Sequence, residues 1–113
     1  MLPRQNIVEP FKRITVDEAK ARLDRRDGCV VIDVRKPNEF QAGHLPGAKL
    51  VPVDDVVKRQ GEIPRDRDVL FVCAVGQRSA LACEYAAALG LTRIFNIEGG
   101  TEGWIKKGYP VEK

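Results

Sequence analysis

The fold is decided by residues 69–89, which read VLFVCAVGQRSALACEYAAAL. The apolar run Val69–Cys73 shows no alternation of polar and apolar residues, which predicts a strand buried on both faces of a sheet. The Ala- and Leu-rich run Ser79–Leu89 predicts a helix that ends at Gly90. A short turn therefore joins the end of a buried strand to the start of a helix.

Elements of the same two kinds flank this unit. Thr15, followed three residues later by Glu18, predicts the capped start of a helix that ends at Asp27–Gly28. The nearly continuous β-branched run Cys29–Val34 predicts a second buried strand. The remaining predicted elements are strands over 49–52 and 92–97, a short strand near 11–14, a helix over 53–60 capped near Asp54 and ended by Gly61, and a final helix carrying Trp104.

Strands that alternate with helices predict an α/β fold with a mainly parallel sheet. The 113 residues suffice for one domain, which we expect over 11–113, after a loose lead-in over 1–10. In open sheets of this kind the ligand site lies at the carboxyl ends of the strands. Among the residues at those ends, Cys73 carries the reactive side chain.

Composition excludes several classes of function. The formal charge of +3 is too small for the dense basic surface of a nucleic-acid-binding protein. No apolar run is long enough to span a bilayer, and Met1–Asn6 lacks the apolar core of a secretory signal, so we expect a cytoplasmic protein without membrane contact. Three cysteines and one histidine show no zinc-ligand spacing, and we expect neither a metal nor a cofactor.

The turn Cys73–Ser79 has the residues of an anion-binding cradle. Backbone N–H groups in a strand-to-helix turn and in the first helical turn have no helical partners, and with the helix dipole they attract negative charge. A cysteine at the base of such a turn is stabilised as the nucleophilic thiolate. Gly76 permits a backbone conformation that other residues resist, Arg78 adds a permanent charge, and Ser79 is placed to cap the helix.

A plainer interpretation of Cys73 is also available. A cysteine at the end of an apolar strand is often a small buried hydrophobic residue without chemistry. The flanking Gly76, Arg78 and Ser79 favour the nucleophile, since an inert strand end needs none of them. Cys29 and Cys83 lack such neighbours, and we interpret both as packing residues.

Five pieces of the sequence stand in one order along the chain: Val31–Arg35, Glu39–Phe40, Gly43–Ala48, the Cys73 loop, and Glu98–Gly100 with Trp104. In this order they resemble the rhodanese-like sulfurtransferases, and the resemblance covers nearly the whole chain from about Thr15 onward. It implies a three-layer fold, in which helices flank both faces of a five-stranded parallel sheet.

The resemblance also implies a reaction. Cys73 would take a sulfane sulfur from a small anionic donor such as thiosulfate and pass it, from a persulfide, to a thiophilic acceptor such as cyanide or a thiol, which a protein can carry. The residues that would hold the substrate anion or the persulfide are Ala74, Val75, Gly76, Gln77, Arg78 and Ser79. We expect this sulfurtransferase to act as a monomer.

Three alternatives remain beside this interpretation. The phosphatases and arsenate reductases that share the fold place five residues between cysteine and arginine, whereas four separate Cys73 from Arg78 here. A sulfur-relay module would form the persulfide but deliver it only to a protein partner. A structural domain without activity would usually have lost the loop cysteine.

Other conspicuous residues have structural interpretations. Asp33 and Arg35 follow a strand and could support the site, but we favour an internal ion pair of Arg35 with Asp33 or Glu39. His44 resembles a histidine that holds the family's turn by hydrogen bonds. Ala74 and Val75 are neither basic nor hydroxylated, so Arg78 is the main local cation for a dianionic donor. A persulfide is therefore an alternative donor to thiosulfate. Trp104 is expected to fill the core, with a hydrogen-bond partner for its N–H.

Overall fold

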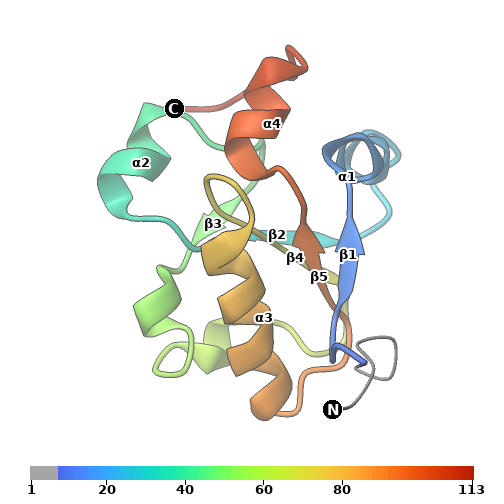
Figure 1. Cartoon of the computed structure of the whole chain (residues 1–113), viewed down its shortest axis with the longest axis vertical. Coiled ribbons are helices and arrows are strands. Elements are labelled where there is room, and N and C mark those ends of the chain that lie inside the picture. The colour runs from blue at the N-terminus through green and yellow to red at the C-terminus, as the bar shows by residue number, and fades with distance from the viewer. Residues whose placement is uncertain (1–7) are drawn as a thin grey trace, which may run out of the picture.

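A computed structural model describes residues 8–113 of the chain, so most of the predicted lead-in over 1–10 lies outside the described residues. Five parallel strands form one sheet in the order β1-β5-β4-β2-β3 (Figure 1). This confirms the predicted α/β fold. The strands are β1 Lys12–Ile14, β2 Val30–Asp33, β3 Lys49–Leu50, β4 Val69–Val72 and β5 Ile94–Ile97.

The centre of the sheet is its most apolar part. All four residues of β4 are buried, and β4 lies between β2 and β5, with Val31 opposite Leu70 and Leu70 opposite Phe95. Such a strand contacts side chains from both faces, which explains why its sequence is continuously apolar. Cys73 follows it directly.

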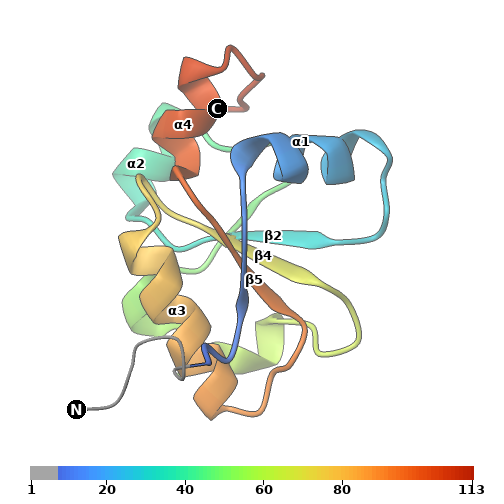
Figure 2. The same ribbon diagram turned by 45° about the vertical axis from the view of Figure 1, so that its right-hand side comes forward.

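Helices cover both faces of the sheet (Figure 2). One face packs against α3, Gln77–Ala88, through Ala82 and Ala86, and against the segment around Val56. The other face packs against α1, Val16–Asp24, and α4, Gly100–Lys106, which bring Ala19 and Trp104 into the core. Small alanines let α3 approach the sheet closely.

Two sequence predictions about this layer are confirmed. Glu18 N–H donates to Thr15 Oγ1 at 3.0 Å and Thr15 N–H donates to Glu18 Oε1 at 3.1 Å, so the predicted cap of α1 is complete. Trp104 is fully buried, and its Nε1–H donates to the carbonyl of Pro110 at 2.7 Å. The start of α1 and the Trp104 side chain of α4 are therefore held by specific hydrogen bonds as well as by packing.

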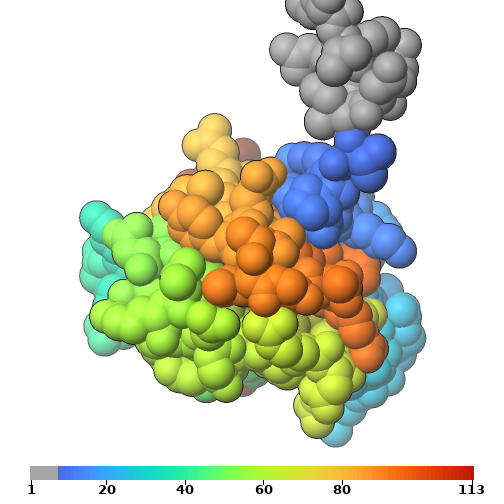
Figure 3. Space-filling view, turned by 90° about the horizontal axis from the view of Figure 1, so that it is seen from below, coloured from blue at the N-terminus to red at the C-terminus, as the bar shows by residue number. Residues whose placement is uncertain are grey.

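The predicted helix over 53–60 is wrong. The segment forms two 3₁₀ turns, Val53–Asp55 and Gln60–Glu62, and Val56 between them is fully buried against α3. A helix of eight residues is marginal on its own, so the burial of Val56 decides the local backbone. Figure 3 shows this segment, in green, packed beside the carboxyl end of α3, in orange.

One helix was missed in the sequence. α2, Pro37–Ala42, has proline in its first turn and Lys36 at its N-cap, without any side chain of the usual capping types. Its six residues include no buried one, so the apolar periodicity that reveals a helix is absent. Its start is held instead by Lys36 N–H, which donates to Glu39 Oε1 at 3.1 Å.

Among residues 8–113, no helix combines the length and the apolar character that crossing a membrane requires.

Candidate active site

Cys73 lies at the carboxyl end of β4, where the chain turns into α3. Gly76 is the N-cap of α3 and has φ +106°, in the region that favours glycine, as the sequence analysis required of this position. The turn between Cys73 and the first residue of α3 therefore consists of only three residues, Ala74, Val75 and Gly76. Cys73 itself is buried, with a relative exposure of 1%.

Several hydrogen-bond donors converge on the sulfur of Cys73. Gly76 N–H donates to Sγ at 3.1 Å, and Ser79 Oγ lies 3.3 Å from it. The backbone N–H groups of Ser79 and Val75 also stabilise the charged sulfur and help to lower the pKa of Cys73. All of these groups are N–H or O–H donors, so the turn is built to bind an anion rather than a cation.

The donors determine the acidity of the thiol. Burial raises the pKa of Cys73, but the Ser79 hydroxyl and the backbone N–H groups of Ser79, Gly76 and Val75 outweigh burial, and the pKa lies below its ordinary value. Burial instead raises the pKa of Cys29 to about 11, with Asp27 adding to the effect, and burial also raises the pKa of Cys83 strongly. Of the three thiols, Cys73 is thus the one suited to react as a thiolate.

The start of α4 shapes the turn from outside. Thr101 N–H donates to the carbonyl of Cys73 at 2.8 Å, and Glu102 N–H donates to the carbonyl of Ala74 at 3.0 Å. These bonds hold the carbonyls away from the sulfur, which leaves the N–H groups of the turn facing it. The approach is so close that a Cβ at Gly100 would lie 2.5 Å from the Cys73 carbonyl oxygen.

The prediction that Ser79 caps α3 is wrong. Gly76 occupies the N-cap, so Ser79 is the third helical residue and its side chain points back to the thiol. The same hydroxyl donates to Asn96 Oδ1 at 2.5 Å, and Asn96 Nδ2 donates to the carbonyl of Gly76 at 3.2 Å and to Glu98 Oε2 at 2.6 Å. Asn96 therefore holds both Gly76 and Ser79, the two residues with the shortest contacts to Sγ.

Arg78 has a partner on α2. Its Nη1 donates to Glu39 Oε1 at 2.7 Å and its Nη2 donates to Glu39 Oε2 at 2.9 Å, so the pair is bidentate. The Arg78 hydrogen bond holds the pKa of Glu39 down at about 2. Glu39 was one of the two partners predicted for Arg35, but in the structure it pairs with Arg78.

Asp33 and Arg35 form the predicted internal ion pair. Arg35 Nη2 lies 2.8 Å from Asp33 Oδ2, and both side chains are buried. Arg35 Nη2 also donates to the carbonyl of Gly43 at 2.8 Å, which ties β2 to the end of α2. His44, which follows Gly43, stacks on the Phe40 ring and forms a hydrogen bond with the Phe40 carbonyl through Nδ1. It therefore holds the turn after α2, as predicted.

A surface hollow of about 310 Å³ lies at the opposite, amino end of the sheet, lined by Cys29 among other residues. Several of its charged groups are paired with one another: Arg22 contacts both Asp27 and Asp68 at 2.7 Å, and Arg93 contacts Asp68 at 2.9 Å. With the pKa of Cys29 raised, this hollow lacks the activated group that the Cys73 turn has.

Asn96 and Gly100 are the residues of the site to which sequence reasoning gave no role. Gly100 belongs to the quoted motif Glu98–Gly100, and two consecutive glycines after a strand are a visible signal for close backbone approach. Asn96 is the single polar residue of the strand Ile94–Ile97, and a lone amide inside an apolar strand is the signal that could have marked it. The structure buries it completely.

Comparison with known proteins identifies the class. The family model of the rhodanese-like domain matches residues 15–107, and the chain therefore belongs to the rhodanese-like family. A crystal structure of a rhodanese-related protein from Thermoplasma volcanium superposes with a TM-score of 0.82 at 31% identity, covering 90% of this chain and 98% of that one.

Several of its relatives are named for sulfur transfer. A sulfurtransferase of Allochromatium vinosum is 35% identical over 98 residues, which are 87% of this chain and 92% of the relative. The thiosulfate sulfurtransferase GlpE of Pseudomonas putida is 34% identical over 102 residues, covering 90% and 91% of the two chains. Sulfur transfer is thus the activity of the family to which this chain belongs.

Proposed function

We propose that the chain is a sulfurtransferase in which Cys73 carries the transferred sulfur as a persulfide. The donor is thiosulfate or a related persulfide, and the acceptor is cyanide or a thiol, including a thiol on a protein. The convergence of the Gly76 N–H and the Ser79 hydroxyl on Sγ is the observation that carries this proposal. Such donors stabilise a thiolate before the reaction and a persulfide anion after it.

The first half-reaction is a displacement at the sulfane sulfur. The Cys73 thiolate attacks the outer sulfur of thiosulfate, the bond between the two sulfur atoms of thiosulfate breaks, and sulfite leaves with the electron pair. In the second half-reaction the acceptor attacks the outer sulfur of the persulfide, and Sγ leaves as the thiolate. With cyanide the product is thiocyanate. Neither step needs an external oxidant or reductant.

The architecture favours sulfur over phosphate as the transferred group. Four residues separate Cys73 from Arg78, and the guanidinium bonds Glu39 with both terminal nitrogens. A phosphate-transferring loop of this fold would be one residue longer and would use its arginine to hold the tetrahedral anion. The turn here offers only a compact set of donors around the sulfur itself.

Steady-state transfer from thiosulfate to cyanide tests the proposal. We expect Cys73→Ser to reduce thiocyanate formation about a thousandfold or more, since a hydroxyl cannot form the persulfide. Cys29→Ser is the matched control and should leave the rate unchanged, because that thiol lies at the other end of the sheet. Parallel lines in double-reciprocal plots are expected for the two-step mechanism. Full activity in Cys73→Ser would overturn the proposal.

A further inference from the structure

We infer that Glu39 determines donor specificity: by neutralising Arg78 beside the thiol, it makes the enzyme favour singly charged sulfur donors over the dianion thiosulfate. The inference rests on the proposed function and names the substrate class that the site prefers. It concerns α2, a helix that sequence reasoning missed, and an ion pair between residues 39 positions apart.

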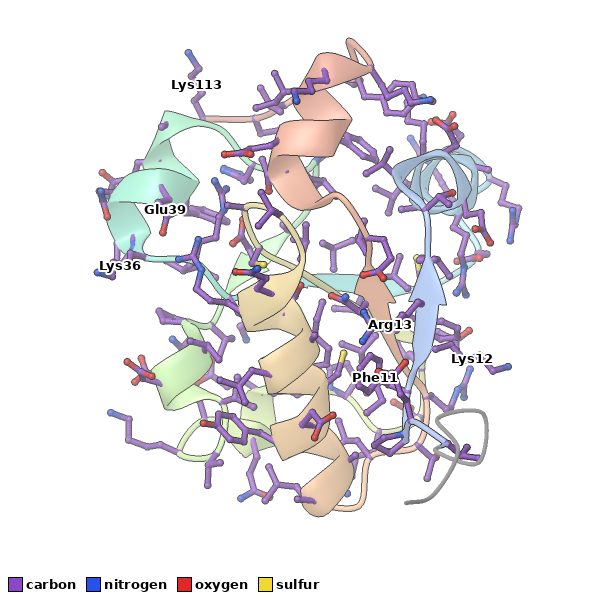
Figure 4. The ribbon with its side chains drawn as sticks, viewed as in Figure 1. Phe11, Lys12, Arg13, Lys36, Glu39 and Lys113 are labelled. Carbon is purple, nitrogen blue, oxygen red and sulfur yellow. The ribbon has the colours of Figure 1, made fainter. Side chains whose placement is uncertain are left out.

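The ion pair holds the Arg78 guanidinium through two hydrogen bonds. Both terminal nitrogens of Arg78 are bound to the Glu39 carboxylate, at 2.7 and 2.9 Å. Glu39 is itself held, because its Oε1 accepts from Lys36 N–H at the start of α2. Figure 4 shows Lys36 extending outward at the start of α2. Glu39 on the same helix contacts Arg78 of α3. The side chains of the pair are about one-third exposed, at 35% and 29%. The hydrogen bond with Glu39 raises the pKa of Arg78 most, and Arg78 is close enough to Cys73 for the thiolate charge to raise that pKa further.

The positive charges around the turn are paired with carboxylates. Arg13, which lies opposite Asn96 in the sheet, is neutralised by Glu9 and Glu98. Arg78 balances Glu39, and Arg35 balances Asp33 at 2.8 Å. The attraction that remains comes from the backbone N–H groups, the Ser79 hydroxyl and the start of α3, all of which act over short distances. A donor that approaches the thiolate therefore meets a repulsion that no local net positive charge offsets. That repulsion grows with the charge on the donor.

This arrangement separates two kinds of donor. Thiosulfate carries two negative charges close to its reactive sulfur. A persulfide of a thiol, or a thiosulfonate, carries one. The chemistry with Cys73 is the same for each: Sγ attacks the terminal sulfur, the sulfur–sulfur or sulfur–sulfonyl bond breaks, and a thiolate, sulfinate or sulfite leaves with the electron pair. The charge on the donor is thus the property that Glu39 selects.

The test compares thiosulfate with methanethiosulfonate, which has the same sulfane sulfur but a methyl group in place of one charged oxygen. kcat/KM for each donor is measured with cyanide as the acceptor, in the wild type and in Glu39→Gln. Glutamine keeps the size of the side chain and an acceptor for Lys36 N–H, while it removes the charge. We expect the ratio of kcat/KM for thiosulfate to that for methanethiosulfonate to rise on the order of fivefold in Glu39→Gln. The rise should shrink at high salt, which screens the newly uncompensated Arg78.

Glu62→Gln is the matched control. Glu62 also forms a two-point ion pair with an arginine, Arg59, at 2.7 and 2.9 Å, but it lies in the second 3₁₀ turn. Its substitution should leave the donor ratio unchanged. A ratio that does not rise in Glu39→Gln, or that rises equally in Glu62→Gln, would overturn the inference. Failure of the proposed function gives a different result, namely no Cys73-dependent transfer from either donor in the wild type.

Discussion

The hydroxyl oxygen of Ser79 lies 3.3 Å from Sγ of Cys73, which makes this serine a ligand of the sulfur rather than the cap of its helix. The same hydroxyl faces Asn96 Oδ1, and it has one proton for two acceptors. Asn96 cannot turn its amide over, because Nδ2 already faces the Gly76 carbonyl and the Glu98 carboxylate. The sulfur and Asn96 Oδ1 therefore compete for the single Ser79 proton. When Cys73 ionises, the Ser79 proton is available to the thiolate.

Ser79→Ala should therefore make Cys73 less acidic. The variant removes one donor to the thiolate while the backbone N–H groups remain, so we expect the pKa of Cys73 to rise. The rate of alkylation by iodoacetamide, followed against pH, reports this pKa directly. Both proteins should carry Cys29→Ser, so that the signal comes from Cys73. An unchanged pH profile would show that the hydroxyl does not stabilise the thiolate.

Gly100→Ala should destabilise the protein severely. The new Cβ would lie 2.5 Å from the Cys73 carbonyl oxygen, and the residue has φ +59°. Because the obstacle is backbone on a buried turn, we expect a loss of about 3 kcal/mol or more in the free energy of unfolding. Gly61→Ala is the control, since its Cβ would meet nothing within 4 Å. Urea denaturation of both variants checks the prediction, and equal stability of the two would contradict it.

The Arg35–Asp33 pair should behave as a structural pair. Arg35→Met would leave the fully buried Asp33 without a counter-ion, which costs about 3–5 kcal/mol when a buried pair is broken. Adding Asp33→Asn removes the stranded charge and should restore part of that stability. Thermal or urea unfolding measures both. If the double variant were no more stable than Arg35→Met, an unpaired charge would not be the cause.

From the Arg78–Glu39 pair we predict that the free energy of unfolding decreases in acid. The Arg78 hydrogen bond lowers the pKa of Glu39 from 4.5 to about 2 in the folded protein. A lowered pKa stabilises the fold above the unfolded-state pKa, and this stabilisation disappears as the pH falls from about 4.5 towards 2. Unfolding free energies measured over this range should fall less steeply in Glu39→Gln. Identical slopes in the two proteins would argue against the pair.

The sequence predicts those parts of the fold that depend on local patterns. β-Branched and apolar runs identified the buried strands, and the Thr15–Glu18 spacing identified the start of α1. α2 was missed because it buries no residue, and the 53–60 segment was misassigned because the tertiary burial of Val56 decides its backbone.

The site shows the same division between local and long-range information. Cys73 and Gly76 follow from the turn between a strand and a helix. The partner of Arg78 lies 39 residues away on α2, and the partner of Ser79 lies 17 residues away on β5. Neither contact leaves a local signal, because each forms only when α2 and β5 are brought beside α3.

The most direct test of the central claim is the intact mass of the protein after incubation with thiosulfate and desalting, with Cys73→Ser treated in parallel. We predict a gain of one sulfur atom in the wild type alone, which dithiothreitol removes. Two added oxygens have nearly the same mass as one sulfur, but a sulfinic acid would survive dithiothreitol. If protein with a free, reactive Cys73 gains no reducible sulfur from thiosulfate or from methanethiosulfonate, or if Cys73→Ser gains the same mass, the persulfide account of this site is contradicted.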